Sequence, residues 1–460
     1  MTHVTVSEYE RLYRGKGDEE TGDSRGERRV LSEKHFQRLR SFDEKHADGT
    51  GDQIFEWRRN RMWPKNWVGV VQLGGLTVEV LPKFHRHGID TLQARRNLIY
   101  MLVTAGDVPA RPRDVADLAT GQTTLLDVFV DLFARRLRDE LHQGLHRSYE
   151  RRSENSPKLK GKLDFSEHFK HNAARKDRFF VQYDDYVEDN QLNRIFKAAC
   201  RRLRTVISRP SVDEVLKHCL LVLGDVKDTP VRPPDFDRVH FSRKNRRFKE
   251  SFDFCRMLYL GLSPTGTFGQ TRTYSLLFDM NSVYERFITD FMRSRVLRGD
   301  LRDRYRLHPQ SKHLKRYLLW TGPSERSGPV RMKPDILLMG RDDQEPIIID
   351  TKWKLLEEGT TGSPKGISTG DLYQLYAYAQ RFGAQRSILL YPKGGRSLQA
   401  ETYHVPESNS SGDNGGKEVG VEFVDLNGDL ARSSAARDRL AEDLTKLVRR
   451  ELSPESRPAH

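Results

Sequence analysis

Three charged residues near position 340 have the types and the spacing that metal-dependent hydrolysis of a phosphodiester requires. Asp335 begins the apolar run 334–339. The next apolar run, 346–353, passes through three isoleucines and then presents Asp350 and Lys352. A charged group at the end of a buried strand is costly unless it is paired or bound to a metal ion. These residues are therefore candidates for a functional site, although each also has an ordinary interpretation as a strand-end or surface residue.

The two apolar runs predict an antiparallel hairpin that brings the acidic residues together. The start of the first strand in a hairpin lies beside the end of the second, so Asp335 and Asp350 should converge. Two adjacent carboxylates repel each other unless a cation lies between them, and Mg²⁺ prefers oxygen ligands. Side chains alternate along a strand, so Lys352 shares the face of Asp350, where its ammonium can stabilise a phosphate under attack. The sequence thus predicts a Mg²⁺ site, at which Mn²⁺ can substitute, with the Thr351 carbonyl as a further ligand.

The order of these residues resembles a known nuclease pattern. Pro334-Asp335 followed by Asp350-Thr351-Lys352 resembles the PD-(D/E)xK motif. Gln374 and Tyr378 lie four residues apart on a predicted helix, share one face of it, and resemble the QxxxY motif of the RecB-like branch.

The segment 278–285 is similar to the helix that supplies an additional acidic residue in such nucleases, and Glu285 is the candidate here. The resemblance implies six catalytic residues: Asp335, Asp350, Lys352, Gln374, Glu285 and Tyr378. It implies metal ligation by Asp335, Asp350, Glu285 and the carbonyl of Thr351.

Longer segments resemble McrC, the family of endonuclease subunits of McrBC modified-cytosine restriction systems. They are FDMNSVYERF, PDILL, IIIDTKWK, DLYQLYAYA, VGVVQLGGLTVEVLPKF, KLKGKLDF and YDDYVEDNQLNRIFK, which together span residues 66–392. The first 60 residues, the extra loops and the C-terminal tail match little of that family. The resemblance implies cleavage of double-stranded DNA in antiviral defence, activated by a McrB-like AAA+ GTPase hexamer that binds the N-terminal region. The chain has no GxxxxGK[ST] loop, which agrees with a motor on another chain.

The elements that must position these residues predict a multidomain α/β protein. Residues 1–88 predict a β-rich N-terminal domain for partner docking. Its clearest feature is a hairpin of 68–73 and 76–81, joined by Gly74-Gly75, because a two-residue turn of this kind needs positive φ at both positions. A helix over 32–42 with Ser32 as N-cap precedes it, and the polar stretches 15–28, 44–53 and 406–417 predict loops or linkers.

Two further domains follow. Residues 89–272 predict a mainly helical, basic middle domain, with helices over 92–105 and 123–145. Residues 273–460 predict a PD-(D/E)xK restriction-endonuclease-like core. Its predicted elements are a helix over 278–297, strands over 316–320, 334–339 and 346–353, a helix over 371–382 and a strand over 387–392.

The charge balance favours a polyanionic partner. The chain has 79 Lys and Arg against 65 Asp and Glu, a formal charge of +14. Two basic clusters, 146–165 and 241–249, are interleaved with aromatic residues, as suits a phosphate backbone beside exposed bases. The candidate DNA contacts are Arg243, Lys244, Arg246, Arg247, Lys158, Lys160 and Lys162. A solvated basic face is an equally good interpretation of both clusters.

Other features limit the class of protein. The three cysteines, Cys200, Cys219 and Cys255, form no CxxC pair, so neither a zinc site nor a disulfide framework is indicated, and a reducing cytoplasm fits. No run of 18 apolar residues exists, so no membrane span is expected. Two other functions stay open: a stand-alone RecB-like repair nuclease, and a non-catalytic DNA-binding adaptor.

Overall fold

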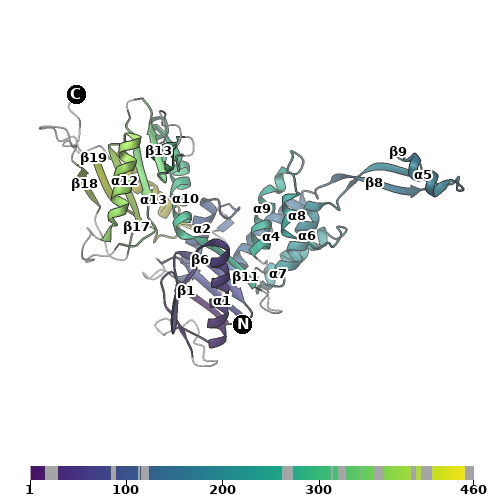
Figure 1. Cartoon of the computed structure of the whole chain (residues 1–460), viewed down its shortest axis with the longest axis horizontal. Coiled ribbons are helices and arrows are strands. Elements are labelled where there is room, and N and C mark those ends of the chain that lie inside the picture. Colours follow the sequence, from purple (N-terminus) through teal and green to yellow (C-terminus); the bar gives the residue numbers. More distant parts are fainter. Residues whose placement is uncertain are drawn as a thin grey trace. The chain divides into compact units, whose positions relative to one another are not determined.

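The structure is a computed structural model of the 460-residue chain. The chain divides into two compact units, one formed by residues 1–121 and 265–460 and the other by residues 122–264 (Figure 1). The described residues are 2–15, 29–83, 90–111, 114–115, 124–261, 273–311, 314–319, 328–342, 344–356, 366–394, 400–405 and 417–450. None of the helices within these ranges is long and apolar enough to cross a membrane.

The first unit begins with a four-stranded sheet in the order β1-β7-β6-β11. Its strands are β1 (Thr2–Ser7), β7 (Leu76–Leu81), β6 (Trp67–Leu73) and β11 (Thr273–Asp279). Strands β6 and β7 form the predicted hairpin, with φ of 48° at Gly74 and 94° at Gly75. Every residue of β7 is buried, since β1 pairs parallel with its other edge. The hairpin prediction is therefore confirmed, and the first residues of the chain complete its sheet.

Strand β11, about 200 residues later in the sequence, forms the edge of this sheet beside β6 and leads directly into helix α10 (Met280–Phe291). The predicted helix start at Phe278 is wrong, because Phe278 pairs with Val68 in the sheet. Asp279 then caps the helix by accepting hydrogen bonds from the backbone N–H groups of Asn281 and Ser282. The helix continues as a π-helical turn, Met292–Val296, and a short helix, α11 (Asp300–Arg304), follows.

A second small sheet, in the order β3-β2-β5-β4, packs with helix α1 (Glu33–Thr50). Its strands are β2 (Leu12–Arg14), β3 (Val30–Leu31), β4 (Phe55–Arg58) and β5 (Arg61–Pro64). Ser32 is the N-cap, as predicted, but the supposed linker 44–53 is helical as far as Thr50. The buried Asp43 of this helix accepts hydrogen bonds from Ile54 N (2.7 Å) and Trp57 Nε1 (2.6 Å), which tie the helix to β4 and the residue before it. The stretch 16–28 lies outside the described residues, as do 406–416.

A six-stranded sheet in the order β12-β15-β16-β17-β19-β18 forms the C-terminal part of this unit. Its strands are β12 (Tyr305–Pro309), β15 (Ile336–Gly340), β16 (Ile347–Thr351), β17 (Arg386–Pro392), β18 (Glu401–Val405) and β19 (Lys417–Val424). Strands β16, β17 and β19 run parallel, and the other pairs are antiparallel. The separate pair β13 (Arg316–Leu319) and β14 (Val330–Met332) lies beside α12 (Thr369–Phe382).

Helices cover this sheet, which explains the uninterrupted apolar runs of its central strands. Leu375, Tyr378 and Phe382 of α12 pack on one face, while α10 contacts β16 and α13 (Ser434–Arg449) contacts β19. Helix α2 (Thr91–Thr104) packs on α10 and is tied to the loop before α13, since Asn97 Nδ2 donates to the carbonyls of residues 426 and 428. The structural unit thus includes α2 and β11, whereas the predicted boundaries at 88 and 272 assigned α2 to the middle domain and β11 to the nuclease core.

The second unit has a helical body and a β-stranded arm. The helices are α4 (Leu125–His142), α6 (Gln191–Leu203), α7 (Pro210–Val222), α8 (Pro233–Asp237) and α9 (Lys249–Gly261), with a 3₁₀ turn at Arg246–Phe248. The arm, residues 148–187, contains β8 (Ser148–Ser156), β9 (Lys162–Leu163), α5 (Phe165–Asn172) and β10 (Phe179–Val187) (Figure 1). The helical prediction holds for the body but missed the long antiparallel pair β8 and β10. All three cysteines are buried in the body as free thiols.

Candidate functional site

The two predicted acidic residues meet where β15 begins and β16 ends, on the same side of the C-terminal sheet. Ile336 pairs with Ile349 in antiparallel register, so Asp335 and Asp350 are the next residues on either side. Asp335 Oδ2 accepts hydrogen bonds from the backbone N–H of Thr351 (2.8 Å) and from its hydroxyl (2.7 Å). Asp350 is 3% exposed. The hairpin therefore delivers both carboxylates to one place, as its spacing predicted.

The electrostatics of the pair favour a proton or a cation. Burial raises the pKa of Asp335 to about 6, and the nearby charge of Glu285 adds to the rise, while the Thr351 hydrogen bonds oppose it. Burial likewise raises the pKa of Asp350 to about 6, with the charge of Asp335 as the next cause and Lys352 opposing. Each carboxylate is therefore held in an environment that a bound cation would relieve.

Lys352 lies on the same side as Asp350 and is surrounded by acceptors. Its Nζ is 2.7 Å from Asp350 Oδ2 and 3.3 Å from Asp371 Oδ1, and it donates a hydrogen bond to Gln374 Oε1 at 3.4 Å. Desolvation lowers the pKa of Lys352, but the two aspartates outweigh that effect and the net pKa is raised. The side chain is thus a fixed ammonium beside the carboxylates.

Helix α12 supplies the support for that ammonium. Gln374 Nε2 donates to Tyr378 Oη at 2.9 Å, and Tyr378 Oη donates to the carbonyl of Lys333 at 3.3 Å. The two residues of the QxxxY-like motif therefore share one face and join Lys352 to the backbone of Lys333, two residues before Asp335. Asp371, in the first turn of α12, was not predicted, although its position three residues before Gln374 places it on the same face.

Glu285 on α10 lies within electrostatic reach of Asp335 and is held by a residue that the sequence did not indicate. Gln310 donates its side-chain amide to Glu285 Oε1 (2.9 Å) and its backbone N–H to Asp335 O (2.9 Å). Gln310 has a φ of 48°, in the left-handed region that side chains other than glycine rarely adopt. Such strain is commonly retained at functional sites. Here the strained Gln310 donates the hydrogen bonds that hold Glu285 and the backbone of Asp335.

The oxygen donors at this site are the carboxylates of Asp335 and Asp350, with Glu285 nearby. Among the described residues, no three or more His, Cys, Asp or Glu side chains are grouped to hold a metal ion, so Asp335, Asp350 and Glu285 do not form a three-ligand cluster. Asp350 Oδ2 is buried and faces the Lys352 ammonium, whose Nζ lies 2.7 Å away. Two neighbouring carboxylates, each with its pKa raised by burial, fit Mg²⁺, which is commonly held by one or two carboxylates and keeps several waters.

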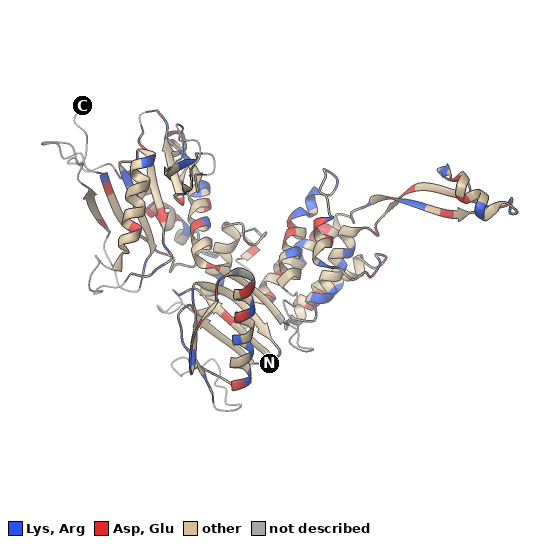
Figure 2. Cartoon of the chain, in the orientation of Figure 1, with Lys and Arg blue, Asp and Glu red and all other residues tan. Residues whose placement is uncertain are grey.

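The predicted DNA contacts all belong to the second unit, and two of them have structural roles. Arg247 donates to the carbonyls of Gln143 (3.1 Å) and Gly144, just after α4. Lys160 pairs with Glu154 at 3.0 Å and donates to Tyr183 Oη at 3.2 Å. Figure 2 shows acidic and basic residues interleaved along the arm, rather than a purely basic surface. The remaining five residues, Arg243, Lys244, Arg246, Lys158 and Lys162, are exposed, and their contact with DNA stays a prediction.

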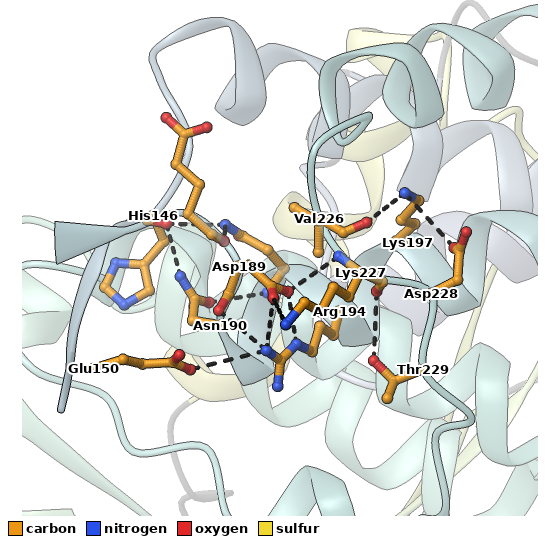
Figure 3. Close-up of polar contacts among 12 residues, drawn as sticks. His146, Glu150, Asp189, Asn190, Arg194, Lys197, Val226, Lys227, Asp228 and Thr229 are labelled. Carbon is orange, nitrogen blue, oxygen red and sulfur yellow. Dashed lines mark hydrogen bonds and ion pairs between the residues drawn. The ribbon is translucent and has the colours of Figure 1, made fainter. Parts of the chain in front are cut away.

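The segment 183–197, which contains one of the McrC-like runs, fixes the base of the arm. Asn193 Nδ2 donates to the carbonyls of His146 (2.9 Å) and Glu188 (2.7 Å), which flank the two long strands. Arg194 donates to both carboxylate oxygens of Asp189, at 2.7 and 2.8 Å (Figure 3). The role of this run in the described unit is to join the arm to α6.

Most of the chain is similar to known proteins. A model of the family described as McrBC 5-methylcytosine restriction system component matches residues 63–392. The chain is 21% identical over 314 residues to the type IV methyl-directed restriction enzyme EcoKMcrBC of Escherichia coli (strain K12), covering 65% of this chain and 85% of that protein.

Two solved structures share the fold. One is a half-complex from a tetradecameric assembly of Thermococcus gammatolerans McrB AAA+ hexamers with bound McrC, with a TM-score of 0.72 and 20% identity over 97% of this chain and 100% of that chain. The other is the Thermococcus gammatolerans McrBC complex, with a TM-score of 0.50 and 23% identity over 65% of this chain and 89% of that one.

Proposed function

Since the chain belongs to the family of McrBC 5-methylcytosine restriction system components, we propose that it is the DNA endonuclease subunit of such a system. The observation that carries the proposal is the convergence of Asp335, Asp350 and Lys352 at one edge of the C-terminal sheet. We assign that sheet and its helices to the PD-(D/E)xK class, because the motif residues occupy a strand end, the next strand end and the following helix in the order the class requires. A non-catalytic adaptor would not need a buried and a half-buried carboxylate beside an ammonium.

The division of labour among the residues follows from their contacts. Asp335 and Asp350 would hold Mg²⁺ or Mn²⁺ together with the Thr351 carbonyl. Glu285, which lies farther from the pair, would be an additional ligand. When bound, the ion supplies Lewis acidity and neutralises charge at the phosphodiester. Lys352 stabilises negative charge on the phosphate under attack and orients the attacking water. Asp371 and Gln374 hold the Lys352 ammonium in place, and Tyr378 holds Gln374.

The proposed partners are double-stranded DNA and a hexameric McrB-like AAA+ GTPase. Support for the second comes from the Thermococcus half-complex, which contains McrB AAA+ hexamers with bound McrC and matches 97% of this chain. The N-terminal part of the first unit is the proposed docking region, and the system would act in the cytoplasm. The net charge of +14 favours association with DNA whatever its sequence.

Cleavage by the chain together with its AAA+ partner tests the proposal. Asp350→Asn should abolish cleavage of methylated duplex DNA in Mg²⁺, and Lys352→Met should slow it by about 100-fold, the usual loss when one stabilising group is removed. Asp303→Asn, at an exposed acid on α11, is the matched control and should cut normally. Co-purification with the partner should be unchanged in all three. Normal cleavage by Asp350→Asn would refute the assignment of this site.

A further inference from the structure

Two residues that follow strands of the N-terminal sheet contact Trp353, the residue directly after Lys352. Glu8 and Lys83, which come after the ends of β1 and β7, are both buried, at 0% and 6% exposure. Lys83 N–H donates to Glu8 Oε2 at 3.0 Å, and Lys83 Nζ donates to the carbonyl of Trp353 at 2.5 Å. Lys83 belongs to the McrC-like run VEVLPKF, whose role the proposed catalytic site does not explain.

Trp353 is held on three sides. Its indole Nε1–H is 3.0 Å from both carboxylate oxygens of Glu8, and Lys83 Nζ lies 4.8 Å from the centre of its rings. Its other neighbour is Tyr284, at 5.2 Å between ring centroids, and Tyr284 directly precedes Glu285 on α10. Trp353 thus joins the N-terminal sheet to the helix that carries the additional acidic residue.

The contact is one peptide unit away from the candidate site. The backbone N–H of Lys352 donates to Leu390 O at 2.9 Å, so Lys352 is still bonded to β17. Trp353, the next residue, is bonded to residues that follow strands of the N-terminal sheet. The same sheet also fixes the start of α10, where Met280 N–H donates to Asn66 O at 2.8 Å and Asn66 donates to the capping residue Asp279. Two of the chain segments that bring charged groups to the site, the end of β16 and the start of α10, are therefore attached to the N-terminal sheet.

The polarity of this contact argues for a geometric role. Burial lowers the pKa of Lys83 to about 8, although the charge of Glu8 opposes the shift. A buried charged pair is usually no more stabilising than well-packed apolar residues of the same volume, because desolvation offsets the attraction. Hydrogen bonds from the pair do restrict geometry, because Trp353 can make them in only one orientation.

We propose that Glu8, Lys83 and Trp353 are positioning residues through which the N-terminal sheet sets the placement of Lys352 and Asp350. This inference rests on the proposed nuclease function. It makes the N-terminal domain a part of the site's scaffold as well as a docking region. Supporting residues one layer away from a metal typically change its affinity or the activity by 10 to 100-fold when they are removed.

Two variants remove polar contacts of Trp353 while keeping most of the side-chain volume. Trp353→Phe keeps a ring against Tyr284 and removes the N–H that Glu8 accepts, whereas Lys83→Met keeps the aliphatic stem and removes the ammonium. The matched control is Glu79→Gln, at a wholly buried carboxylate of β7 that bonds Arg95 instead of the C-terminal sheet. The control should cost thermal stability without acting on the site.

Mn²⁺ binding by the intact chain is measured by titration of the free ion's paramagnetic signal, and cleavage by the complex with its AAA+ partner is measured over a series of Mn²⁺ concentrations. Trp353→Phe and Lys83→Met should each weaken Mn²⁺ binding about 10-fold and shift the cleavage response to higher Mn²⁺. Glu79→Gln should keep the affinity of the wild-type chain even if its melting temperature falls as far. Should Lys83→Met fail to fold, Trp353→Phe carries the test.

The inference is overturned if both variants bind Mn²⁺ and cut DNA as the wild-type chain does. It is also overturned if their affinities fall no further than that of Glu79→Gln at equal thermal stability. Failure of the proposed function looks different: the wild-type complex would not cut DNA, and Asp350→Asn would bind Mn²⁺ as well as the wild-type chain. In that case both proposals fall together.

Discussion

At the scale of single residues, the candidate site is a pair of neighbouring carboxylates, one buried and one half-buried, whose charges are compensated by different neighbours. Asp335 and Asp350 repel each other, Lys352 neutralises one of them, and Thr351 donates two hydrogen bonds to the other. Sequence reasoning found the residues with charges because an ionisable group after an apolar run is conspicuous. It missed Gln310 and Asp371, because their importance depends on contacts with Glu285 and Lys352 that no local pattern encodes.

The first prediction concerns pH. Asp335 and Asp350 have folded-state pKa values of about 6 against an ordinary value of 3.8, so the folded chain binds their protons more tightly than the unfolded chain does. Their contribution to the metal-free free energy of unfolding therefore falls as the pH rises from 3.8 towards 6. Mn²⁺ competes with those protons, so the rise in melting temperature that Mn²⁺ causes should grow as the pH passes through about 6. Asp350→Asn should remove most of that growth, and a Mn²⁺ effect independent of pH between 5 and 8 in the wild-type chain would contradict the site.

The second prediction concerns the support of Lys352. Tyr378→Phe removes the hydroxyl that accepts from Gln374 and should cost about 1 kcal/mol of stability. It should also slow cleavage, because Gln374 would no longer be held against Lys352. Tyr376→Phe, on the same helix, loses a similar bond from Gln380 at 3.0 Å but faces away from the site and serves as the control. Equal cleavage rates for the two variants would show that Tyr378 only stabilises the helix.

At the scale of elements, local patterns predicted what local interactions determine. The β6–β7 hairpin and the N-cap of α1 follow from Gly74-Gly75 and Ser32, whose conformations need no distant partner. Strand β11 could not be recognised, because Phe278 becomes a strand residue only by pairing with Val68, far away in the sequence. The long pair β8 and β10 was missed for another reason. Its residues carry charges such as Arg151 and Asp184 instead of an apolar face, so the usual strand pattern is absent.

The third prediction concerns the base of the arm. The hydrogen bonds from Arg194 lower the pKa of Asp189 to about 2, so its charged form contributes stability above the ordinary pKa of 3.8, and that contribution is lost as the pH falls towards 2. Asp189→Asn should lower the melting temperature at pH 7 and have little effect near pH 2. Amide hydrogen exchange in the arm should increase at pH 7.

Asp213→Asn is the control for the arm, since Arg204 and Lys217 also hold the pKa of Asp213 at about 2, on α7. That variant should lose comparable stability while hydrogen exchange in the arm stays slow. If Asp189→Asn leaves exchange in residues 148–187 unchanged at pH 7, the carboxylate does not hold the arm.

At the scale of the whole molecule, the first unit is assembled from both ends of the described chain. Its N-terminal sheet takes β11 from the segment that leads into the C-terminal sheet, and Trp353 and the loop at 426–430 are bonded to residues before 100. The predicted domain boundaries at 88 and 272 fall within this unit. They were placed where the composition changes, and composition does not reveal hydrogen bonds between segments that are far apart in the sequence.

The fourth prediction follows from that assembly. A fragment of residues 273–460 should not unfold cooperatively, because β11 loses β6, Trp353 loses Glu8 and the 426–430 loop loses Asn97. A fragment of residues 122–264 should unfold as one cooperative unit, since it has its own buried helical core. Circular dichroism during heating measures both. A nuclease-core fragment that melts cooperatively near the temperature of the full chain would show that the N-terminal sheet is dispensable for folding.

The central claim is that Asp335 and Asp350 hold a divalent cation against a phosphodiester. The most direct measurement is the anomalous scattering of Mn²⁺ in crystals of the chain with duplex DNA. The account predicts a peak about 2.1 Å from a carboxylate oxygen of each residue, with a phosphate oxygen in contact and the Lys352 ammonium beside it. A peak elsewhere, or none at saturating Mn²⁺ with Lys352 still paired to Asp350, would contradict it.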